Sequence, residues 1–245
     1  METAAARYLS HMADLCAAVG RDQADNIERA AQLCAMSLGK GGYLLTFGTG
    51  HSHLLALEIF YRAGGLARVI PILDEALMLH RSASESSRIE RIPGLGRELL
   101  ERVPQADDRS VLLLFSNSGC NTVAVEMAET AREKGIPTVA LTSLSHSAAM
   151  TSRHPKGLKL KDVCDVVLDN GGCFGDASIE VGQIKTGPTS TAIGAMLLQA
   201  VVCRTVELCL TSGTDPEVFT SANTPEGDRA NEALIEKYRD IVPAL

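Results

Sequence analysis

Apolar residues recur along the chain in two alternating patterns. Residues 1–38 carry them at helical spacing, with a break near Gly20 and Arg21, so we expect two helices there. Short aliphatic runs then alternate with further helical patterns. The runs that predict strands lie at 43–47, 67–73, 110–115, 137–143 and 163–169. The patterns that predict helices lie at 52–63, 94–103, 121–134, 189–211 and about 225–239.

Continuous aliphatic strands that alternate with helices are typical of a mainly parallel sheet covered on both faces. The sequence therefore predicts an α/β protein, a doubly wound three-layer sandwich with an N-terminal helical extension. We expect residues 1–40 to pack on the core or on a dimer partner, and residues 41–245 to form a single domain. The polar stretch 74–93 and the Gly-rich stretch 169–188 are expected to be loops.

Composition and charge narrow the possible partners. The 245 residues are 45% hydrophobic, which is ample for a core, and the net charge is -7. Lys and Arg are dispersed along the chain, which argues against nucleic-acid or anionic-membrane partners. The apolar run 186–203 is interrupted by Pro188 and Gln199, so we expect a buried helix there rather than a membrane span.

Cysteine usage and the N-terminal pattern bear on the compartment. The seven cysteines are odd in number and contain no C-x-x-C pair. They are typical of reduced core thiols. The first residues, METAAARYLSHMADLC, do not resemble a signal peptide. We therefore expect a cytoplasmic protein.

The stretch FSNSGCNT, residues 115–122, lies between an expected strand and an expected helix. Hydroxyls, amides and backbone N–H groups at a helix N-terminus favour an anion, and Gly119 lets the backbone turn those groups inward. Since G-x-x-x-x-G-K-[ST] is absent, a single phosphate ester fits better than a triphosphate with magnesium. The alternative is an ordinary strand-to-helix turn. The candidate phosphate-binding residues are Ser116, Asn117, Ser118, Gly119, Asn121 and Thr122.

A second Gly-rich turn, in TFGTGHSHLLALE at residues 46–58, carries two imidazoles and a hydroxyl. It is not a dinucleotide fingerprint, because G-x-G-x-x-G requires a glycine where His53 stands. A metal at His51 and His53 would need further ligands from His80, His146 or His154, and none has diagnostic spacing. We expect neither a metal nor a cofactor.

Both stretches resemble a known family. SNSGCNTVAVEMAETAREKGIPTVALTS is similar to the phosphate loop, helix and strand of the sugar isomerase (SIS) domain, and GGYLLTFGTGHSHLLALE is similar to its first strand and loop. The resemblance covers roughly residues 25–212 and is nearest to a bacterial phosphoheptose-isomerase-like subgroup, with FYRAGGL and DNGG. It implies a phosphosugar-binding sandwich, usually a homodimer or homotetramer with sites at subunit boundaries. It also implies that Ser116, Ser118 and Thr122 hold the phosphate, while Gly48, Thr49, Gly50 and Ser52 border the sugar.

The chemistry requires a base. Aldose–ketose interconversion and elimination β to a carbonyl both begin when a positioned carboxylate or imidazole removes the C2 proton. His51 and Glu58 are the candidates, although His51 can simply cap a helix and Glu58 can pair with Arg62. The resemblance places the family's usual glutamate near Arg62, so either Glu58 or another residue must replace it. Lys185 can neutralise phosphate or stabilise an enolate, or be a solvated loop residue.

Three functions fit these residues. The first is an aldose–ketose isomerase of a sugar phosphate. The second is a dehydratase or etherase that eliminates the C3 substituent of an (N-acetyl)hexosamine 6-phosphate through the same enolate. The third is a non-catalytic sugar-phosphate sensor, although no DNA-binding helix pair with a basic face is evident.

Overall fold

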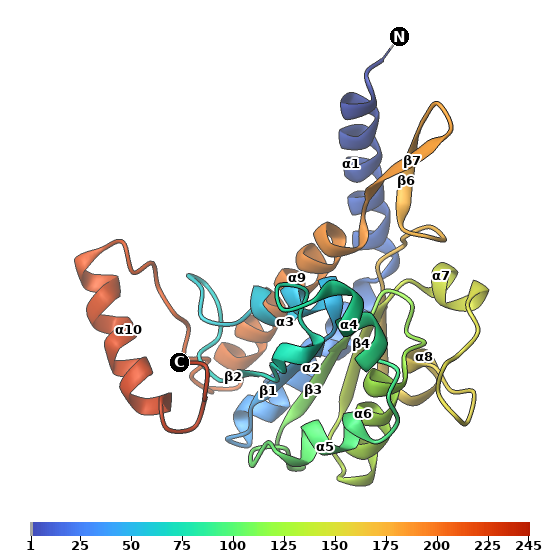
Figure 1. Cartoon of the computed structure of the whole chain (residues 1–245). Coiled ribbons are helices and arrows are strands. Elements are labelled where there is room, and N and C mark those ends of the chain that lie inside the picture. The colour runs from blue at the N-terminus through green and yellow to red at the C-terminus, as the bar shows by residue number, and fades with distance from the viewer. Residues whose placement is uncertain (1) are drawn as a thin grey trace.

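A computed structural model describes residues 2–245 and contains a five-stranded sheet in the order β2-β1-β3-β4-β5 (Figure 1). All of its pairings are parallel. The strand order reverses between β1 and β3, which is the topological switch point where ligands of such sheets bind. The strands are β1 (Leu44–Gly48), β2 (Val69–Pro71), β3 (Val111–Phe115), β4 (Thr138–Thr142) and β5 (Val166–Asp169).

Helices cover both faces of the sheet. On one face, α2 (Ala24–Gly39), α3 (His53–Glu58) and α9 (Ser190–Thr211) share a core with alternate strand residues. On the other face, α5 (Leu95–Glu101), α6 (Thr122–Glu133) and α8 (Leu160–Val163) share a second core. The predicted doubly wound α/β sandwich is therefore confirmed.

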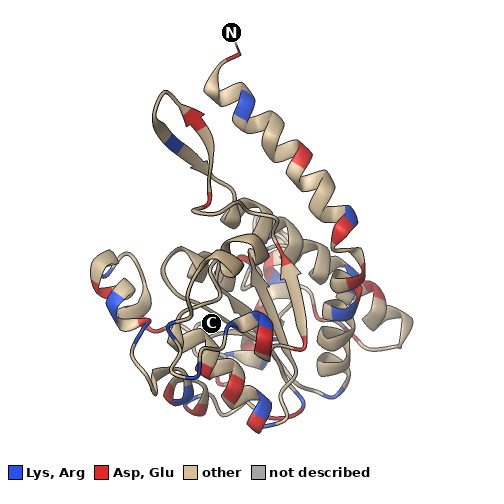
Figure 2. Ribbon diagram, turned by 90° about the vertical axis from the view of Figure 1, so that its right-hand side faces the viewer, with Lys and Arg blue, Asp and Glu red and all other residues tan. Residues whose placement is uncertain are grey.

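Shorter and peripheral elements complete the described chain. They are α1 (Ala4–Asp22), η1 (Gly50–Ser52), η2 (Glu75–Leu77), α4 (Ala83–Ile89), α7 (Leu144–Ala149), β6 (Ala177–Val181), β7 (Ile184–Pro188) and α10 (Pro225–Tyr238). The last residue of α10, Tyr238, packs its ring edge-on against Tyr43, so the end of this helix contacts the body (Figure 1). Lys and Arg are interspersed with Asp and Glu over the body (Figure 2).

Three expectations about the elements were wrong. The helix expected to run to residue 63 ends at Glu58, and Tyr61 adopts a left-handed φ of 42° that no helix continues through. The stretch 169–188, expected to be a loop, contains the antiparallel hairpin β6–β7, which turns at Gly182 with a φ of 64°. The stretch 74–93, also expected to be a loop, contains η2 and α4.

The helix α1 and the hairpin β6–β7 extend from the body side by side, and we call them the arm (Figures 1 and 2). The hydroxyl of Tyr8 in α1 donates to the carbonyl oxygen of Pro188 in β7 at 2.8 Å. Gly187 is required opposite the ring, because a Cβ there would lie 2.8 Å from Cδ2 of Tyr8. The arm therefore has an internal packing contact of its own.

The helix α9 is the one helix in the described part of the chain with the length and apolar composition of a membrane span. Its residues Leu197, Leu198, Val201 and Val202 are nevertheless buried in the core against α2 and the sheet. These contacts are those of a core helix.

Candidate functional site

The two Gly-rich loops meet at the switch point of the sheet. Strands β1 and β3 are neighbours in register, with Gly48 opposite Phe115, so the loops that follow them begin side by side. They border a cavity of about 250 Å³, which we call the site cavity. It is lined by His51, Ser52, Leu55, Ser116, Asn117, Leu141, Asn170, Asp176, Pro188, Ser190 and Thr191.

The first loop is shaped by its glycines. A Cβ on Gly48 would lie only 2.4 Å from the carbonyl oxygen of Ser52, and Gly50 has a φ of 56°. Both positions therefore require glycine for the η1 turn. The turn directs the two imidazoles differently: His53 is buried with Nδ1 against the carbonyl oxygen of Gly50, whereas His51 is exposed and borders the cavity.

Thr49 lies beside the cavity rather than in its lining. Its hydroxyl donates to Oε2 of Glu90 at 2.5 Å. Because the backbone carbonyl of Glu90 also accepts from the N–H of Val123 at 3.2 Å, the segment after α4 connects the first loop to the first turn of α6. Thr49 thus supports the loop from outside.

The second loop, residues 116–121, presents backbone donors. The hydroxyl of Ser116 accepts from the N–H of Gly119 at 3.1 Å, and Gly119 has the left-handed φ of 60° that makes this turn. Within the described chain, no acceptor takes the backbone N–H groups of Asn117, Ser118 or Asn121. These free donors precede the N-terminus of α6, an arrangement that favours an anion.

The predicted phosphate-binding residues are not all in the lining. Ser116 and Asn117 border the cavity, while the hydroxyl of Ser118 accepts from the N–H of Cys120 at 3.4 Å. Thr122 is buried, and its hydroxyl donates to the carbonyl oxygen of Arg153 at 2.9 Å. The side chain of Asn121 accepts from Nη1 of Arg153 at 2.7 Å.

An amide pair connects the second loop to the strand end of β5. The buried Asn170 donates through Nδ2 to Oδ1 of Asn117 at 2.9 Å and accepts from the N–H of Gly172 at the same distance. The backbone carbonyl of Asn117 accepts from the hydroxyl of Thr142 at 3.1 Å. The orientation of Asn117 is therefore set by three strand ends.

The sequence did not indicate Asp176 as a site residue. Its carboxylate binds the N-terminus of α9: Oδ1 accepts from the N–H groups of Thr189 at 3.1 Å and Ser190 at 2.9 Å, and Oδ2 accepts from the hydroxyl of Ser190 at 2.6 Å. Asp176 also has a left-handed φ of 66°, which Asp tolerates better than most residues. The hairpin lies between Asp176 and α9 in the sequence, so no local motif shows that they meet.

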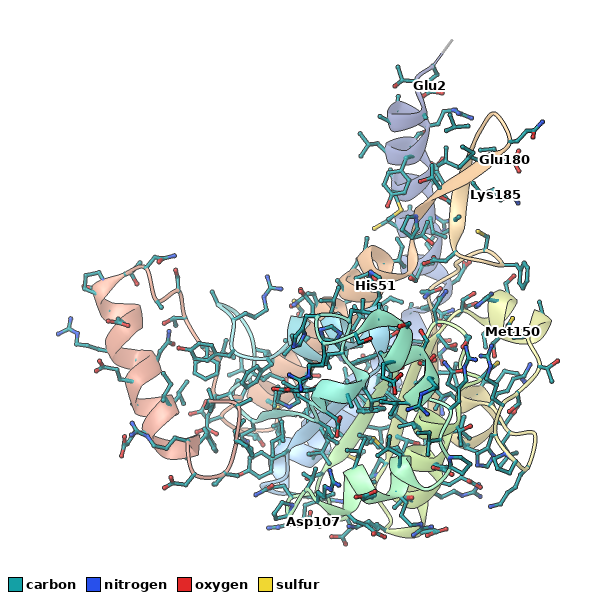
Figure 3. All side chains as sticks on the ribbon, viewed as in Figure 1. Glu2, His51, Asp107, Met150, Glu180 and Lys185 are labelled. Atoms are coloured by element: carbon teal, nitrogen blue, oxygen red, sulfur yellow. The ribbon has the colours of Figure 1, made fainter. Side chains whose placement is uncertain are left out.

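Glu58 and Lys185 lie outside the cavity lining. Glu58 pairs with Arg62 and accepts from Nε2 of Gln199 at 3.0 Å. Lys185 lies on the arm, 3.5 Å from Oε1 of Glu180, with 65% of its side chain exposed. Figure 3 shows Lys185 and Glu180 on the hairpin, well apart from His51.

Few titratable side chains line the site cavity. His51 and Asp176 are the titratable side chains in its lining, and none of the described residues that line it is Lys or Arg. Among the described residues there is also no group of three His, Cys, Asp or Glu side chains placed to hold a metal. An anion in this cavity would be held by neutral donors.

Known proteins resemble this chain in sequence and in fold. The SIS domain model matches residues 7–143. A UPF0309 protein of Listeria innocua is 41% identical over 228 residues, 91% of each chain. A UPF0309 protein of Halalkalibacterium halodurans is 42% identical over 222 residues, 90% of this chain and 91% of its own.

Among solved structures, a phosphoheptose isomerase from Francisella tularensis superposes with a TM-score of 0.53 at 16% identity, over 83% of this chain and 95% of its own. The phosphoheptose isomerase from Neisseria gonorrhoeae gives 0.52 at 17% identity, over 83% and 96%. At these identities the structures establish the fold alone. The strand order, the paired loops and the match over more than half of the chain lead to one conclusion: this protein belongs to the SIS domain family.

Proposed function

We propose that this protein binds a sugar phosphate in the site cavity and interconverts its aldose and ketose forms. One observation carries the proposal: Asn117, whose backbone N–H has no acceptor among the described residues, and the exposed imidazole of His51 border the same cavity at the switch point. The backbone donor can bind a phosphate ester, and the imidazole can remove a C2 proton. The fold shared with two phosphoheptose isomerases supports the same class of reaction.

The loop of Ser116 to Asn121 binds the phosphate in this proposal. A phosphate dianion there gains from the free N–H groups and from the positive end of the α6 dipole, and it requires no lysine or arginine. The hydroxyls of Ser52 and Ser116 add donors in the cavity lining. The sugar carbons then lie towards His51 and the N-terminus of α9.

His51 removes the C2 proton in the proposed reaction. A neutral imidazole takes the C2 proton and an enediolate forms with its charge on the C1 oxygen. The proton of the C2 hydroxyl then moves to the C1 oxygen, the C2 carbonyl forms, and the imidazolium returns its proton to C1, so one group serves both carbon steps. The short turn of η1 holds His51 at the cavity. His53 is buried, so its imidazole supports the first loop. Glu58 would act on this cavity only if its contacts with Arg62 and Gln199 were exchanged for contacts with the substrate.

We also propose that the protein assembles as a homodimer or homotetramer through the arm. Leu9 of α1 and Ile184 of β7 are 69% and 70% exposed, and Phe174 next to the hairpin is 60% exposed. An isolated two-stranded hairpin is marginally stable in water, so a second copy packed on it would stabilise it. Pro188 and Asp176 connect the arm to the cavity, which supports a site close to the proposed boundary. The free cysteines fit a cytoplasmic location.

The proposal is tested by offering hexose, heptose and N-acetylhexosamine phosphates one at a time and following the products by proton NMR. Aldose–ketose conversion of at least one substrate, lost in His51→Asn and absent for the sugar without phosphate, is the expected result. Loss of the C3 substituent would instead establish an eliminating enzyme. Binding of a sugar phosphate without any chemical change would establish a sensor and overturn the proposed reaction.

A further inference from the structure

Asp176 is the one acidic side chain in the lining of the site cavity. We infer that its carboxylate selects the substrate class: sugar phosphates that present hydroxyl or ammonium groups bind, and sugar phosphates that carry a second acidic group are excluded. The inference rests on the proposed function, because it takes the phosphate to be bound at the loop of Ser116 to Asn121. It concerns what the part of the cavity lined by Asp176 accepts.

The N-terminus of α9 and the loop that precedes α6 both border the cavity, and these two helices differ in what their N-termini hold. The first turn of α9, a helix of 22 residues, already holds the carboxylate of Asp176, which accepts from two backbone N–H groups and two hydroxyls. The N-terminus of α6 has no capping side chain, since Asn121 makes no such bond. Of these two helices, only α6 therefore has an N-terminus that is free to attract the phosphate.

The hydrogen bonds of Asp176 leave one oxygen available. Oδ1 accepts three of them, from the N–H and hydroxyl of Thr189 and from the N–H of Ser190, whereas Oδ2 accepts only from the hydroxyl of Ser190. An ionised carboxylate has about four acceptor positions on its two oxygens. Oδ2 can therefore accept one more donor, such as a sugar hydroxyl or an ammonium group.

The same charge repels a second anion. Since no Lys or Arg lines the described cavity, nothing there would neutralise a substrate carboxylate next to Asp176. Two unit negative charges about 4 Å apart repel enough, even with the screening of bulk water, to weaken binding about fivefold. Partial burial strengthens the effect, because the screening is then weaker.

The inference separates acidic ether substrates from the other candidate sugar phosphates. Hexose, heptose and hexosamine phosphates have no charge beyond the phosphate except an ammonium group. A hexosamine 6-phosphate whose C3 oxygen carries a lactyl ether has an additional carboxylate, so Asp176 disfavours it. The isomerase substrates are therefore favoured over that acidic ether.

Binding calorimetry with three ligands tests the inference: N-acetylglucosamine 6-phosphate, its 3-O-lactyl ether, and the lactamide of that ether. The acid and the amide have the same size and differ in charge alone. For the wild-type protein we expect the amide to bind at least about fivefold more tightly than the acid. In Asp176→Asn the amide oxygen can still accept from α9, and we expect the preference to fall below about twofold.

A matched control is Ser190→Ala, which removes one hydrogen bond but retains the charge, and it should keep the preference of the wild-type protein. Equal binding of acid and amide by the wild-type protein, or an unchanged preference in a folded Asp176→Asn protein, would overturn the inference alone. If none of the three phosphates binds, the inferred acceptance of amino-sugar phosphates is overturned while the proposed function stands; if N-acetylglucosamine without its phosphate binds equally well, the proposed function is overturned and this inference with it.

Discussion

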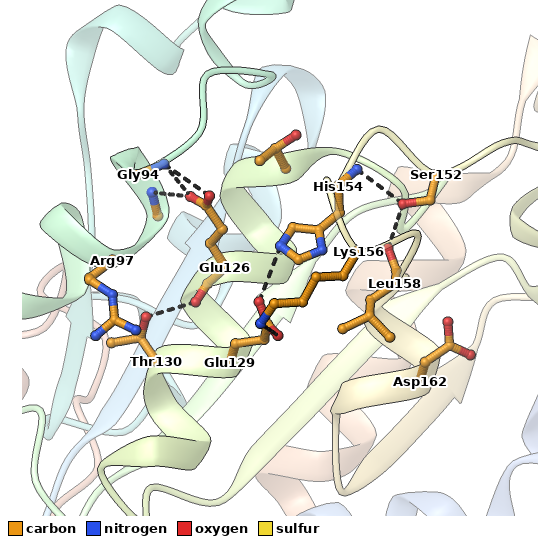
Figure 4. A network of polar contacts seen from close by, with 12 residues as sticks. Gly94, Arg97, Glu126, Glu129, Thr130, Ser152, His154, Lys156, Leu158 and Asp162 are labelled. Carbon is orange, nitrogen blue, oxygen red and sulfur yellow. Dashed lines mark hydrogen bonds and ion pairs between the residues drawn. The ribbon is translucent and has the colours of Figure 1, made fainter.

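Nε2 of His154 lies 3.1 Å from Oε2 of Glu129, and this contact joins the segment behind the second loop to α6 (Figure 4). The side chain of His154 is only 3% exposed. The preceding residue, Arg153, donates its backbone N–H to the carbonyl oxygen of Cys120 at 2.9 Å and accepts from the hydroxyl of Thr122 at the same distance. The His154–Glu129 pair therefore supports the candidate phosphate loop from outside the cavity.

His154→Ala should loosen this support without touching the cavity. We expect KM for the phosphorylated substrate to rise severalfold with a smaller change in kcat, and the free energy of unfolding to fall by about 1–3 kcal/mol because Glu129 loses a buried partner. Steady-state kinetics and urea unfolding measure the two effects. Lys156→Ala is the control, since Lys156 contacts the same carboxylate with a 68% exposed side chain and should have little effect. Equal effects of the two substitutions would contradict this role for His154.

Gly119→Ala should impair phosphate binding more than folding. The left-handed φ costs an alanine about 1–2 kcal/mol, and the new Cβ would lie 3.0 Å from Oγ1 of Thr142. The loop must shift to relieve that contact, so its free N–H groups move. Affinity for inorganic phosphate, measured by calorimetry, should fall at least tenfold, about 1.4 kcal/mol. Gly20→Ala in α1 has no atom within 4 Å of the new Cβ and should leave affinity unchanged; unchanged affinity in Gly119→Ala would remove the loop from the phosphate site.

His51→Asn and Glu58→Gln distinguish the two candidate bases. If His51 removes the C2 proton, its replacement should lower kcat by about 100-fold or more with little change in KM. Glu58→Gln should lower kcat less, because Glu58 is engaged by Arg62 and Gln199 rather than by the cavity. Single-turnover kinetics of both variants make the comparison. The reverse order of effects would assign the proton transfer to Glu58.

Tyr238 should make stability sensitive to alkaline pH. Burial and its hydrogen bond to Glu217 raise the pKa of Tyr238 to about 12 from the ordinary value of 10.0. Between about pH 10 and about pH 12 the unfolded chain loses this proton while the folded state keeps it, so the free energy of unfolding falls as pH rises. Urea unfolding at several pH values in this window should show a shallower decline for Tyr238→Phe. Parallel declines of the two proteins would show that Tyr238 does not contribute.

The sheet and its two loops were predictable because their signals are local. Each strand of a parallel sheet is buried on both faces, so runs such as SVLLLF are continuous and easily recognised. Glycines mark the turns after β1 and β3, and strand order brings these turns together. The donor-rich loop and the exposed imidazole of His51 were therefore identified from the sequence.

The features that the sequence did not predict depend on contacts between residues far apart in the chain. Asp176 meets the N-terminus of α9 only because β6–β7 folds back as a hairpin, and the strand ASIEV is too short and too polar to predict that. The end of α3 at Glu58 is set by the left-handed Tyr61, whose ring packs on Phe219 from near the other end of the chain. The burial of His154 against Glu129 likewise leaves no mark in the loop sequence MTSRHPKG.

The most direct test of the account is deuterium exchange at C2 in D₂O, followed by proton NMR on a phosphosugar that calorimetry has shown to bind. Wild-type protein should incorporate deuterium at C2 as aldose and ketose interconvert, and His51→Asn should bind the same ligand with little or no exchange. A bound phosphosugar whose C2 proton never exchanges in the wild-type protein would contradict the proposed deprotonation and leave a binding protein in its place.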